Sequence, residues 1–446
     1  MSPRAKKPSR SREPARLIAA ARAVDVPASC DVAVVGGGAS GLVAAITAAE
    51  EGASVVVLER DLACGRTVLA TGNGRCNFAN ISLGPRRYND PAFVTAVAGE
   101  RYLDDILDFF RACGLRWSLE DDRLYPVSRQ AASVRNVLLA RARRAGVVLA
   151  CARTVTAVTP TAASASGAKG APWTVAYTFC GEDKPSPSRT ARLKLAARSV
   201  VLAVGGGVVQ SLAAPLGLAL APDTPVLAPL ACEDSPLAAL DGRRAVVAAQ
   251  AYRDGFPRLR ERGEVLFRDY GLSGIVSFDL SRHVTAGDVV ALDLLPDSNR
   301  SEILQIVDPF MGGTFEDGAF DGLLDPAIAA LLTKLARAGW ELPDDPREDL
   351  PRTTNDTERM IALVKGLPFR VTGVAHPELA QVTRGGIATG ELDPATLATA
   401  STTSLFACGE AVDVDADCGG FNLAWAWKSG MVAGKSAAQT AKRSRA

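Results

Sequence analysis

The first clearly patterned part of the chain is predicted to form a strand, a helix and a second strand. Residues 32–35 (Val-Ala-Val-Val) are a continuous apolar run, which is typical of a parallel strand buried on both faces. The alanine-rich segment from Gly41 onward has helix composition with apolar residues on every face. A further apolar run at 54–58 predicts the next strand. We therefore expect a βαβ unit at this point.

A second strand and helix are predicted close to the C-terminus. Residues 404–406 are a short apolar strand candidate, and residues 424–438 have the composition of an apolar helix. In the middle of the chain, residues 245–248 and 288–294 predict strands. The predicted helices of this middle part are residues 302–307, 326–336 and 357–364.

Composition excludes several classes of partner. The chain carries 50 Lys and Arg against 49 Asp and Glu, a net charge of +1, so it has no overall field that would gather nucleic acid or an anionic membrane. Two uncharged stretches, 32–49 and 199–222, are each interrupted by three consecutive glycines, and we expect neither to span a bilayer. A small-molecule substrate is the expected partner.

The cellular setting and metal content are predicted from a few residue types. Residues 1–27 are basic and lack an apolar segment of the kind that a secretory signal contains, so we expect a disordered tail. Nine cysteines without Cys-x-x-Cys spacing indicate free thiols and a cytoplasmic protein. The two histidines, His283 and His376, are too few for a multi-histidine metal site, and we expect no metal.

The turn of the βαβ unit has the spacing of a dinucleotide-binding loop. Gly36, Gly38 and Gly41 form Gly-x-Gly-x-x-Gly, in which the second glycine lets backbone approach a pyrophosphate at the helix N-terminus. Glu59 ends the next strand, 18 residues after Gly41, where a carboxylate meets ribose hydroxyls. The alternative is an ordinary βαβ unit with chance glycines. The predicted cofactor contacts here are Gly36, Gly37, Gly38, Ala39, Ser40, Gly41 and Glu59.

The segment 60–80 favours FAD over a nicotinamide cofactor. It is rich in glycine and small polar residues without a helical period, as expected of a loop whose backbone presses against a flat ring. Asn73 and Asn77 can hydrogen-bond the ring edge, whereas Cys76 is expected to be a small packed residue. The alternative is a mobile surface loop. The predicted contacts are Arg60, Arg66, Thr71, Gly72, Asn73, Gly74, Cys76 and Asn77.

A third cofactor segment is predicted before the C-terminal helix. Glu410, after Gly409, would hold the ribityl chain, and the start of the following helix would face the flavin pyrimidine edge. The alternative is a simple loop that leads into a helix. The candidate contacts are Gly409, Glu410, Gly419, Gly420, Phe421, Asn422 and Leu423. Val155, Gly205 and Gly386 complete the predicted set, with backbone groups of Val155 offered to adenine.

Three strings give the chain a family resemblance. Residues 70–77 (Ala-Thr-Gly-Asn-Gly-Arg-Cys-Asn), 382–386 and 419–430 closely resemble the BaiN/YhiN-like flavoproteins, also known as the aminoacetone-oxidase family. The resemblance implies an α/β fold with a Rossmann-like FAD-binding domain of glutathione-reductase-like type, interrupted by a β-rich domain and a small helical domain. It also implies noncovalent FAD and, for some members, NAD(P)H-linked reduction of an activated C=C bond in an oxo-steroid.

The sequence departs from the family pattern in three places. A short apolar stretch, 208–217, replaces a loop rich in glycine and aspartate, which leaves the substrate open. Ile275 stands where the family has proline. Phe421 stands where the family has tyrosine, which excludes proton donation from that ring.

These landmarks give a predicted domain organisation. The FAD-binding domain comprises 28–207 and 376–440, after a tail at 1–27. A β-rich insertion covers 208–300 and 366–375, and a helical insertion covers 301–365.

The predicted function is that of an FAD-dependent oxidoreductase. A second dinucleotide site is not expected, because Gly205-x-Gly207-x-x-Gln210 lacks the third glycine. NAD(P)H would therefore act as a transient donor for reduction of an activated C=C bond. The alternatives are an O2-dependent oxidase of an amine or hydroxyl and a flavin-binding sensor without turnover. The sequence identifies no catalytic acid or base.

Overall fold

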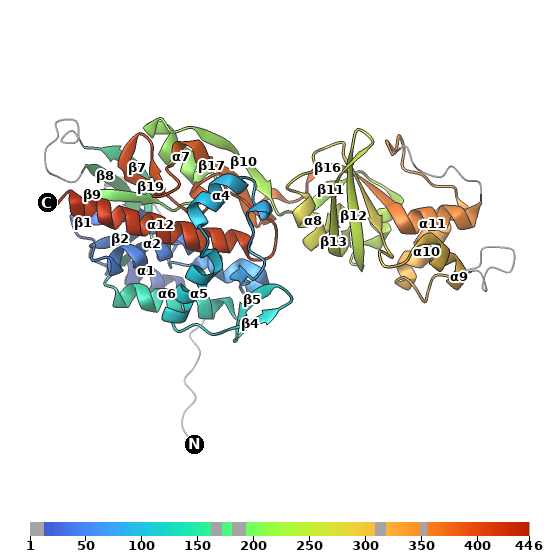
Figure 1. Cartoon of the computed structure of the whole chain (residues 1–446), viewed down its shortest axis with the longest axis horizontal. Coiled ribbons are helices and arrows are strands. Elements are labelled where there is room, and N and C mark those ends of the chain that lie inside the picture. Colours follow the sequence, from blue (N-terminus) through green and yellow to red (C-terminus); the bar gives the residue numbers. More distant parts are fainter. Residues whose placement is uncertain (1–12, 162–171, 181–192, 308–317, 348–354, 446) are drawn as a thin grey trace, which may run out of the picture. The chain divides into compact units, whose positions relative to one another are not determined.

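The chain folds into two compact units in the computed structural model, which describes residues 13–161, 172–180, 193–307, 318–347 and 355–445. The first unit comprises the described residues up to Thr224 together with those from Thr383 (Figure 1). The second unit comprises the described residues between Pro225 and Val382.

The first unit is built on an eight-stranded sheet with the path β18-β19-β9-β1-β2-β6, to which β8 and β7 add beside β9. Strands β19, β9, β1, β2 and β6 run parallel, whereas β18, β8 and β7 pair with their neighbours in antiparallel fashion. The strands of this sheet are β1 (Ser29–Val35), β2 (Val55–Leu58), β6 (Val148–Ala150), β7 (Arg153–Pro160), β8 (Trp173–Phe179), β9 (Leu193–Leu202), β18 (Ala398–Thr399) and β19 (Thr402–Ala407).

Smaller sheets and helices complete this unit. A three-stranded sheet has the order β3-β5-β4, and β10 pairs with β17 at the boundary with the second unit. These strands are β3 (Ala79–Asn80), β4 (Trp117–Glu120), β5 (Arg123–Pro126), β10 (Leu220–Val226) and β17 (Val382–Ile387). The helices are α1 (Glu13–Arg22), α2 (Ala39–Glu50), α3 (Arg66–Ala70), α4 (Pro91–Ala98), α5 (Tyr102–Ala112), α6 (Ala131–Arg144), α7 (Val208–Ala213) and α12 (Phe421–Arg443).

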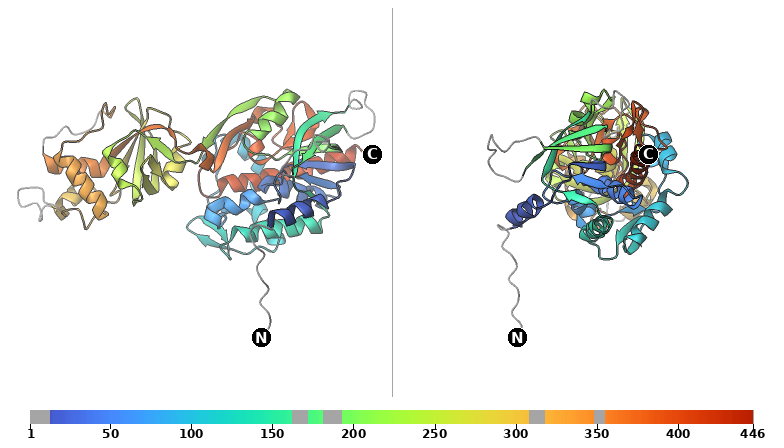
Figure 2. Two further views of the ribbon diagram at one scale, coloured as in Figure 1. Left: turned by 180° about the vertical axis from the view of Figure 1, so that it is seen from behind. Right: turned by 90° about the vertical axis from the view of Figure 1, so that its left-hand side faces the viewer.

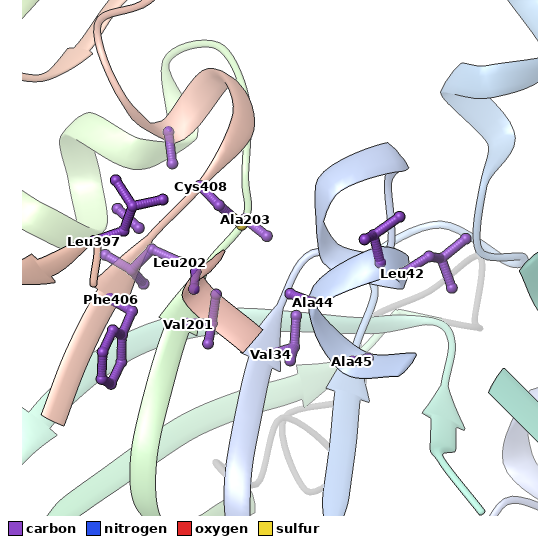
Figure 3. Packing of buried hydrophobic residues seen from close by; sticks show 14 of the residues in the cluster. Val34, Leu42, Ala44, Ala45, Val201, Leu202, Ala203, Leu397, Phe406 and Cys408 are labelled. Atoms are coloured by element: carbon purple, nitrogen blue, oxygen red, sulfur yellow. The ribbon is translucent and has the colours of Figure 1, made fainter. Parts of the chain in front are cut away.

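The predicted βαβ unit and the C-terminal strand and helix are confirmed. Strand β1 is buried along its length after Ser29, as its continuous apolar run predicts. Figure 3 shows Val34, Val201 and Phe406 on the neighbouring strands β1, β9 and β19, with Ala44 of α2 beside them. These side chains are buried, so the parallel sheet and α2 share one core. Within the described residues, no helix is both long and apolar enough to cross a bilayer.

Helices α2 and α12 pack against each other through glycines of α12. A Cβ added at Gly430 would lie 2.6 Å from the carbonyl oxygen of Ser40, and one at Gly434 would overlap the carbonyl oxygen of Ala44. The two backbones are therefore in contact at a distance that only glycine permits. The contact places the N-terminal halves of both helices on the same part of the sheet.

The expected disordered tail at 1–27 is wrong in part, because residues 13–22 form the helix α1 (Figure 2). This helix is bound to the first unit through its C-terminal end. The Arg153 guanidinium donates to the carbonyl oxygen of Ala21 at 3.4 Å, and that of Arg22 lies 5.5 Å from the centre of the Phe179 ring. Residues 1–12 lie outside the described residues.

The first unit also extends beyond the predicted boundary at 207 and resumes at Thr383 rather than at 376. Helix α7 packs into its core through Val209 and Leu212, and the amide of Ala388 donates to the carbonyl oxygen of Ala219 at 3.0 Å. The short apolar stretch after Gly207 is therefore part of the first unit, not of the insertion.

The second unit combines a closed six-stranded barrel with helices. The barrel order is β11-β14-β13-β12-β15-β16. Its strands are β11 (Leu230–Cys232), β12 (Arg244–Arg253), β13 (Phe256–Arg268), β14 (Gly271–Ser273), β15 (Val289–Asp293) and β16 (Leu367–Val374), and its helices are α8 (Ile275–Leu280), α9 (Arg300–Val307), α10 (Pro326–Arg337) and α11 (Asp356–Gly366). The predicted strands and helices of the middle part are confirmed. Leu292 of the barrel and Leu332 and Met360 of the helices belong to one core, so the β-rich and helical insertions form one unit.

We expect Gly434→Ala to destabilise the protein by about 1–3 kcal/mol, because the new methyl group must push α2 and α12 apart. Helix propensity alone would make alanine more stable than glycine here by up to about 1 kcal/mol. A loss of stability therefore indicates the clash between the two helices. Urea unfolding measures it. Gly390→Ala is the matched control, because no atom lies within 4 Å of the added Cβ. An equal effect at both positions would contradict the close packing of the two helices.

Candidate functional site

The turn between β1 and α2 is fixed by its first and third glycines. Gly36 has φ of +102°, and an added Cβ would lie 2.5 Å from the carbonyl oxygen of Ala203. A Cβ at Gly41 would overlap the carbonyl oxygen of Gly36. These two glycines are therefore required by the packing of strand, turn and helix, as the spacing predicts.

Gly38, unlike Gly36 and Gly41, is not packed against protein backbone, and the space beside it fits a bound ligand. Its φ of −76° is open to any residue, and an added Cβ would meet only the Thr67 hydroxyl, at 3.6 Å. Gly38 is the N-cap of α2, and no side chain of the described residues caps this helix. The protein's own packing does not require a glycine here. A pyrophosphate approaching the helix N-terminus does require one, because its oxygens need the space that a side chain would fill.

Glu59 lies beside this turn at the end of β2. Its carboxylate accepts from the Gly37 amide at 2.6 Å and from the Asp61 amide at 2.7 Å. Each carboxylate oxygen keeps acceptor capacity for a ribose hydroxyl. The two amides hold the carboxylate against the glycine turn, where the sequence places the adenosine ribose.

The basic residues that follow Glu59 lie at the surface. Arg60 is exposed. Arg66 is 73% exposed and lies 3.6 Å from the Asp61 carboxylate. Both side chains are free to reach the phosphates of a cofactor. Their role as ligands stays a prediction.

Strand β7 supports Glu59 from the other side. The Arg153 amide donates to the carbonyl oxygen of Glu59 at 2.7 Å. Val155 follows two residues later, and it pairs with Tyr177 of β8. Val155 thus lies at the adenosine end of the proposed site, and its backbone contact with adenine stays a prediction.

The segment expected to be a loop contains a short helix, α3, followed by a tight turn. Residues 71–74 form a 3-10 turn, and the Cys76 amide donates to the carbonyl oxygen of Thr71 at 3.0 Å. Gly72, Asn73, Gly74 and Cys76 all have left-handed backbone conformations, with φ of 54°, 53°, 82° and 56°. For Asn73 and Cys76 such a conformation costs about 1–3 kcal/mol, and it is concentrated at ligand-binding sites.

The two buried polar residues at the end of this turn differ in their chemistry. Burial raises the pKa of the Cys76 thiol to about 11, against a smaller effect of its hydrogen bond with Thr71, so Cys76 is a neutral packed thiol at pH 7. Asn77 is buried, and its Oδ1 has no hydrogen-bond partner among the described residues. An unsatisfied buried acceptor is costly, and a ring N–H donor of a bound flavin would satisfy it.

Segment 71–80, called the flavin loop below, and the start of α12 lie side by side although they come from opposite ends of the chain. The Asn80 side-chain amide donates to the carbonyl oxygen of Gly419 at 3.0 Å. A Cβ at Gly420 would lie 2.9 Å from both the Ala79 carbonyl oxygen and the Asn77 Oδ1 atom. The Trp427 indole N–H donates to the carbonyl oxygen of Phe78 at 2.8 Å. The Asn77 Oδ1 atom, which has no hydrogen-bond partner among the described residues, thus lies where segment 71–80 meets the start of α12.

The residues after Gly420 form the first turn of α12. The Asn422 side chain accepts from the Ala416 amide at 2.9 Å and donates to its carbonyl oxygen at 2.8 Å. Its amide therefore orders the preceding loop, and Leu423 is half-buried beside it. The Tyr88 hydroxyl donates to the carbonyl oxygen of Phe421 at 2.9 Å. These contacts fix the direction of the helix N-terminus.

Gly409 and Glu410 are held between α2 and α12. The Gly409 amide donates to the Ser429 hydroxyl at 3.0 Å, and its carbonyl oxygen accepts from the Trp425 indole at 3.1 Å. A Cβ at Gly409 would overlap the Ser40 side chain. Trp425 and Trp427 are buried on different faces of α12, and each one anchors a predicted cofactor segment.

Glu410 is surrounded by two further predicted glycines. A Cβ at Gly205 would overlap the Glu410 carboxylate, and one at Gly386 would lie 2.8 Å from the carbonyl oxygen of Ala411. Burial raises the pKa of Glu410 to about 7, against a smaller effect of a hydrogen bond from the Thr383 backbone. Hydroxyl donors of a ribityl chain would supply the hydrogen bonds that an ionised carboxylate lacks here.

Next in sequence to Thr383, whose backbone binds Glu410, lies an ion pair that the sequence reasoning missed. Arg384 donates to the two carboxylate oxygens of Asp415 at 2.6 and 3.0 Å, and Asp415 is fully buried. Burial opposes the charge of Arg384, but its bonds to Asp415 and the nearby Asp413 charge raise its pKa overall. The signal was the Thr-Arg-Gly-Gly string, of which only a glycine was predicted to be part of the site.

These parts together define the class of protein. The chain is an FAD-dependent oxidoreductase with a Rossmann-like FAD-binding fold, and the glycine turn, Glu59 and the glycine-rich start of α12 are its predicted cofactor site. The chain belongs to the HI0933-like family, whose Rossmann-domain model matches residues 30–436. This family is the one that the sequence strings resemble.

Two curated relatives match over nearly the whole chain. A 3-dehydro-bile acid delta(4,6)-reductase of Clostridium scindens is 31% identical over 442 residues, covering 92% of this chain and 99% of the relative. A ribosomal RNA dihydrouridine synthase of Escherichia coli is 23% identical over 411 residues, covering 90% and 96%. Among solved structures, the open form of a flavocytochrome c3 fumarate reductase is 16% identical with a TM-score of 0.49, covering 99% of this chain and 85% of that structure.

The surroundings of Gly38 lead to a prediction that separates binding from folding. We expect Gly38→Ala to weaken FAD binding tenfold or more, while lowering the stability of the apoprotein by at most about 1 kcal/mol through the poorer helix cap. Titration of the apoprotein with FAD and urea unfolding measure the two effects. Gly41→Ala is the contrasting variant, since its methyl group meets protein backbone and should destabilise the apoprotein itself. Unchanged FAD affinity in Gly38→Ala would remove this turn from the site.

The raised pKa of Glu410 predicts a pH dependence of apoprotein stability. The folded state favours the protonated carboxyl, so this contribution is fully present below pH 4.5 and is lost as the pH rises to about 7. We expect wild-type stability to fall by about 3 kcal/mol relative to Glu410→Gln across this window. Exposed Glu100→Gln is the control. Parallel stability curves for wild type and Glu410→Gln would show that Glu410 is not buried in this way.

Proposed function

We propose that the protein is an NAD(P)H-linked, FAD-dependent reductase of an activated C=C bond in a small organic substrate, with oxo-steroids as the substrate class. The observation that carries the proposal is the similarity to a 3-dehydro-bile acid delta(4,6)-reductase, which covers 92% of this chain and 99% of the relative. The rRNA dihydrouridine synthase is a more distant relative, and its name also describes hydrogen addition to a ring double bond. Reduction of a C=C bond is therefore the shared reaction type that we assign.

The chain's own residues have separate roles in this proposal. FAD, when bound, supplies the hydride chemistry. The glycine turn and Glu59 bind the diphosphate and the adenosine ribose, and Glu410 binds the ribityl chain. The N-terminus of α12 orients the flavin pyrimidine edge and favours negative charge there, while Asn77 accepts from the ring.

Two further observations support the proposed donor and the proposed compartment. Gly205-x-Gly207 precedes α7, and the Gln210 amide donates to the carbonyl oxygen of Ala221 at 2.7 Å, so backbone contacts occupy the position of the missing third glycine. NAD(P)H would thus visit the flavin transiently instead of using a second dinucleotide site. Free cysteines among the described residues support a reducing compartment, and we assign the protein to the cytoplasm.

Anaerobic photometry tests the donor. We expect NADH or NADPH to bleach the flavin absorbance of the purified protein, and an oxo-steroid with a conjugated double bond to restore it. Mass spectrometry should show that the steroid has gained two hydrogens. The saturated oxo-steroid is the matched control and should leave the flavin reduced.

Other outcomes of this experiment would contradict the proposal. Reduction of the flavin by an amine or alcohol, with O2 as acceptor and no response to NAD(P)H, would show an oxidase. A flavin that no donor reduces would show a binding protein without turnover. If ribosomal RNA reoxidises the reduced flavin and no steroid does, the substrate is RNA, as in the name of the more distant relative.

A further inference from the structure

Two cysteine thiols face each other at the edge of the sheet. Cys64 follows β2 and Cys151 follows β6, and their Sγ atoms lie 3.6 Å apart although 87 residues separate them in sequence. Both are free thiols. Cys64 is buried and Cys151 is half-buried, so a small reagent reaches the pair through Cys151.

The pair lies against the glycine turn. A Cβ added at Gly37 would be 2.6 Å from the Cys64 Sγ atom, and the Gly65 amide donates to the carbonyl oxygen of Gly37 at 2.7 Å. On the other side, the carbonyl oxygen of Ala150, next to Cys151, accepts from the Glu59 amide at 3.0 Å. Each cysteine thus adjoins one of the groups to which the adenosine and diphosphate end of FAD is assigned.

We propose that Cys64 and Cys151 form a redox modification site, in which a reversible disulfide between them weakens FAD binding. The disulfide itself depends only on the geometry of the two thiols. Its effect on FAD rests on the proposed function, because that proposal assigns the cofactor to this turn.

The reaction takes place with a low-molecular-weight disulfide as oxidant. The hydrogen bond from the Cys64 thiol lowers the pKa of Cys151 and raises that of Cys64, so Cys151 is the attacking thiolate. Its sulfur bonds to one sulfur of the small disulfide and expels the other as a thiolate. Cys64 then loses its proton to that thiolate or to water and attacks Cys151, which releases the second small thiol. Two protein thiols are oxidised and one small disulfide is reduced to two thiols.

Bond formation must displace the two cysteine side chains from their positions in the reduced protein. An S–S bond is about 2.05 Å long, so the sulfurs approach by about 1.5 Å from their distance in the reduced protein. Because Cys64 packs on Gly37, and Gly37 binds the Glu59 carboxylate, this movement pulls on the turn that approaches the diphosphate. The Arg135 side chain, which donates to the carbonyl oxygen of Cys64 at 2.8 Å, holds the opposite side of the loop.

The first experiment tests the disulfide on the full-length protein as purified. Incubation in glutathione buffers of increasing oxidising poise, followed by alkylation and peptide mapping, should yield a Cys64–Cys151 linked peptide lighter by two hydrogens, which dithiothreitol reverses. Cys151→Ser should abolish it, whereas Cys180→Ser, which removes an exposed thiol, should not. Cys180 is exposed and shows whether the buffer is oxidising enough. If Cys180 is oxidised while Cys64 and Cys151 both still react with the alkylating reagent, the proposal is overturned. A stable mixed disulfide at Cys151 would overturn it as well.

The second experiment tests the effect on the cofactor. Fluorescence of released FAD should give a dissociation constant at least tenfold higher for the oxidised than for the reduced wild-type protein, and no difference for Cys151→Ser. Equal affinities in both states would overturn the coupling. If neither form takes up FAD, the proposed function fails, while the linked peptide still decides whether the modification site exists.

Discussion

The site depends on the contact between α2 and α12. These helices begin at residues 39 and 421, and each contributes its N-terminus to the predicted cofactor site. Because Gly430 and Gly434 have no side chains, the two backbones touch, and Gly409 fits into the remaining space against Ser40. A larger residue at any of these three positions would separate the diphosphate end of the site from the flavin end. The predicted cofactor site therefore depends in part on Gly430 and Gly434, which are not themselves predicted cofactor contacts.

The sequence predicted the parts of the site that have local patterns. The glycine turn, Glu59 and the start of α12 are recognisable because strand, turn and helix follow one another within a few residues. The sequence assigned residues 60–80 and the start of α12 to the same cofactor, but it did not predict the hydrogen bond between Asn80 and Gly419. Periodicity also located the strands and helices of the insertion, since each has its own run of apolar residues.

Other features have no local signal. The Arg384 and Asp415 pair joins residues 31 positions apart, and only the fold shows that the carboxylate is buried. The helix α1 belongs to the basic N-terminal segment, and its docking through a backbone carbonyl group has no signal in its composition. The true extent of the first unit depends on the β10 and β17 pairing, which unites residues from the two sides of the insertion.

The junction of Asn80 with Gly419 also has a consequence for biosynthesis. The N-terminal βαβ unit leaves the ribosome first, and domains in general begin to fold during synthesis at about 5–20 residues per second. The partner segment of the flavin loop is made only after the whole barrel and its helices. A nascent chain can therefore form the predicted diphosphate turn early, whereas the predicted site of the ring is complete only after α12 has been made. A chain that stops within the insertion lacks the Gly420 backbone, which lies beside the Asn77 oxygen in the complete fold.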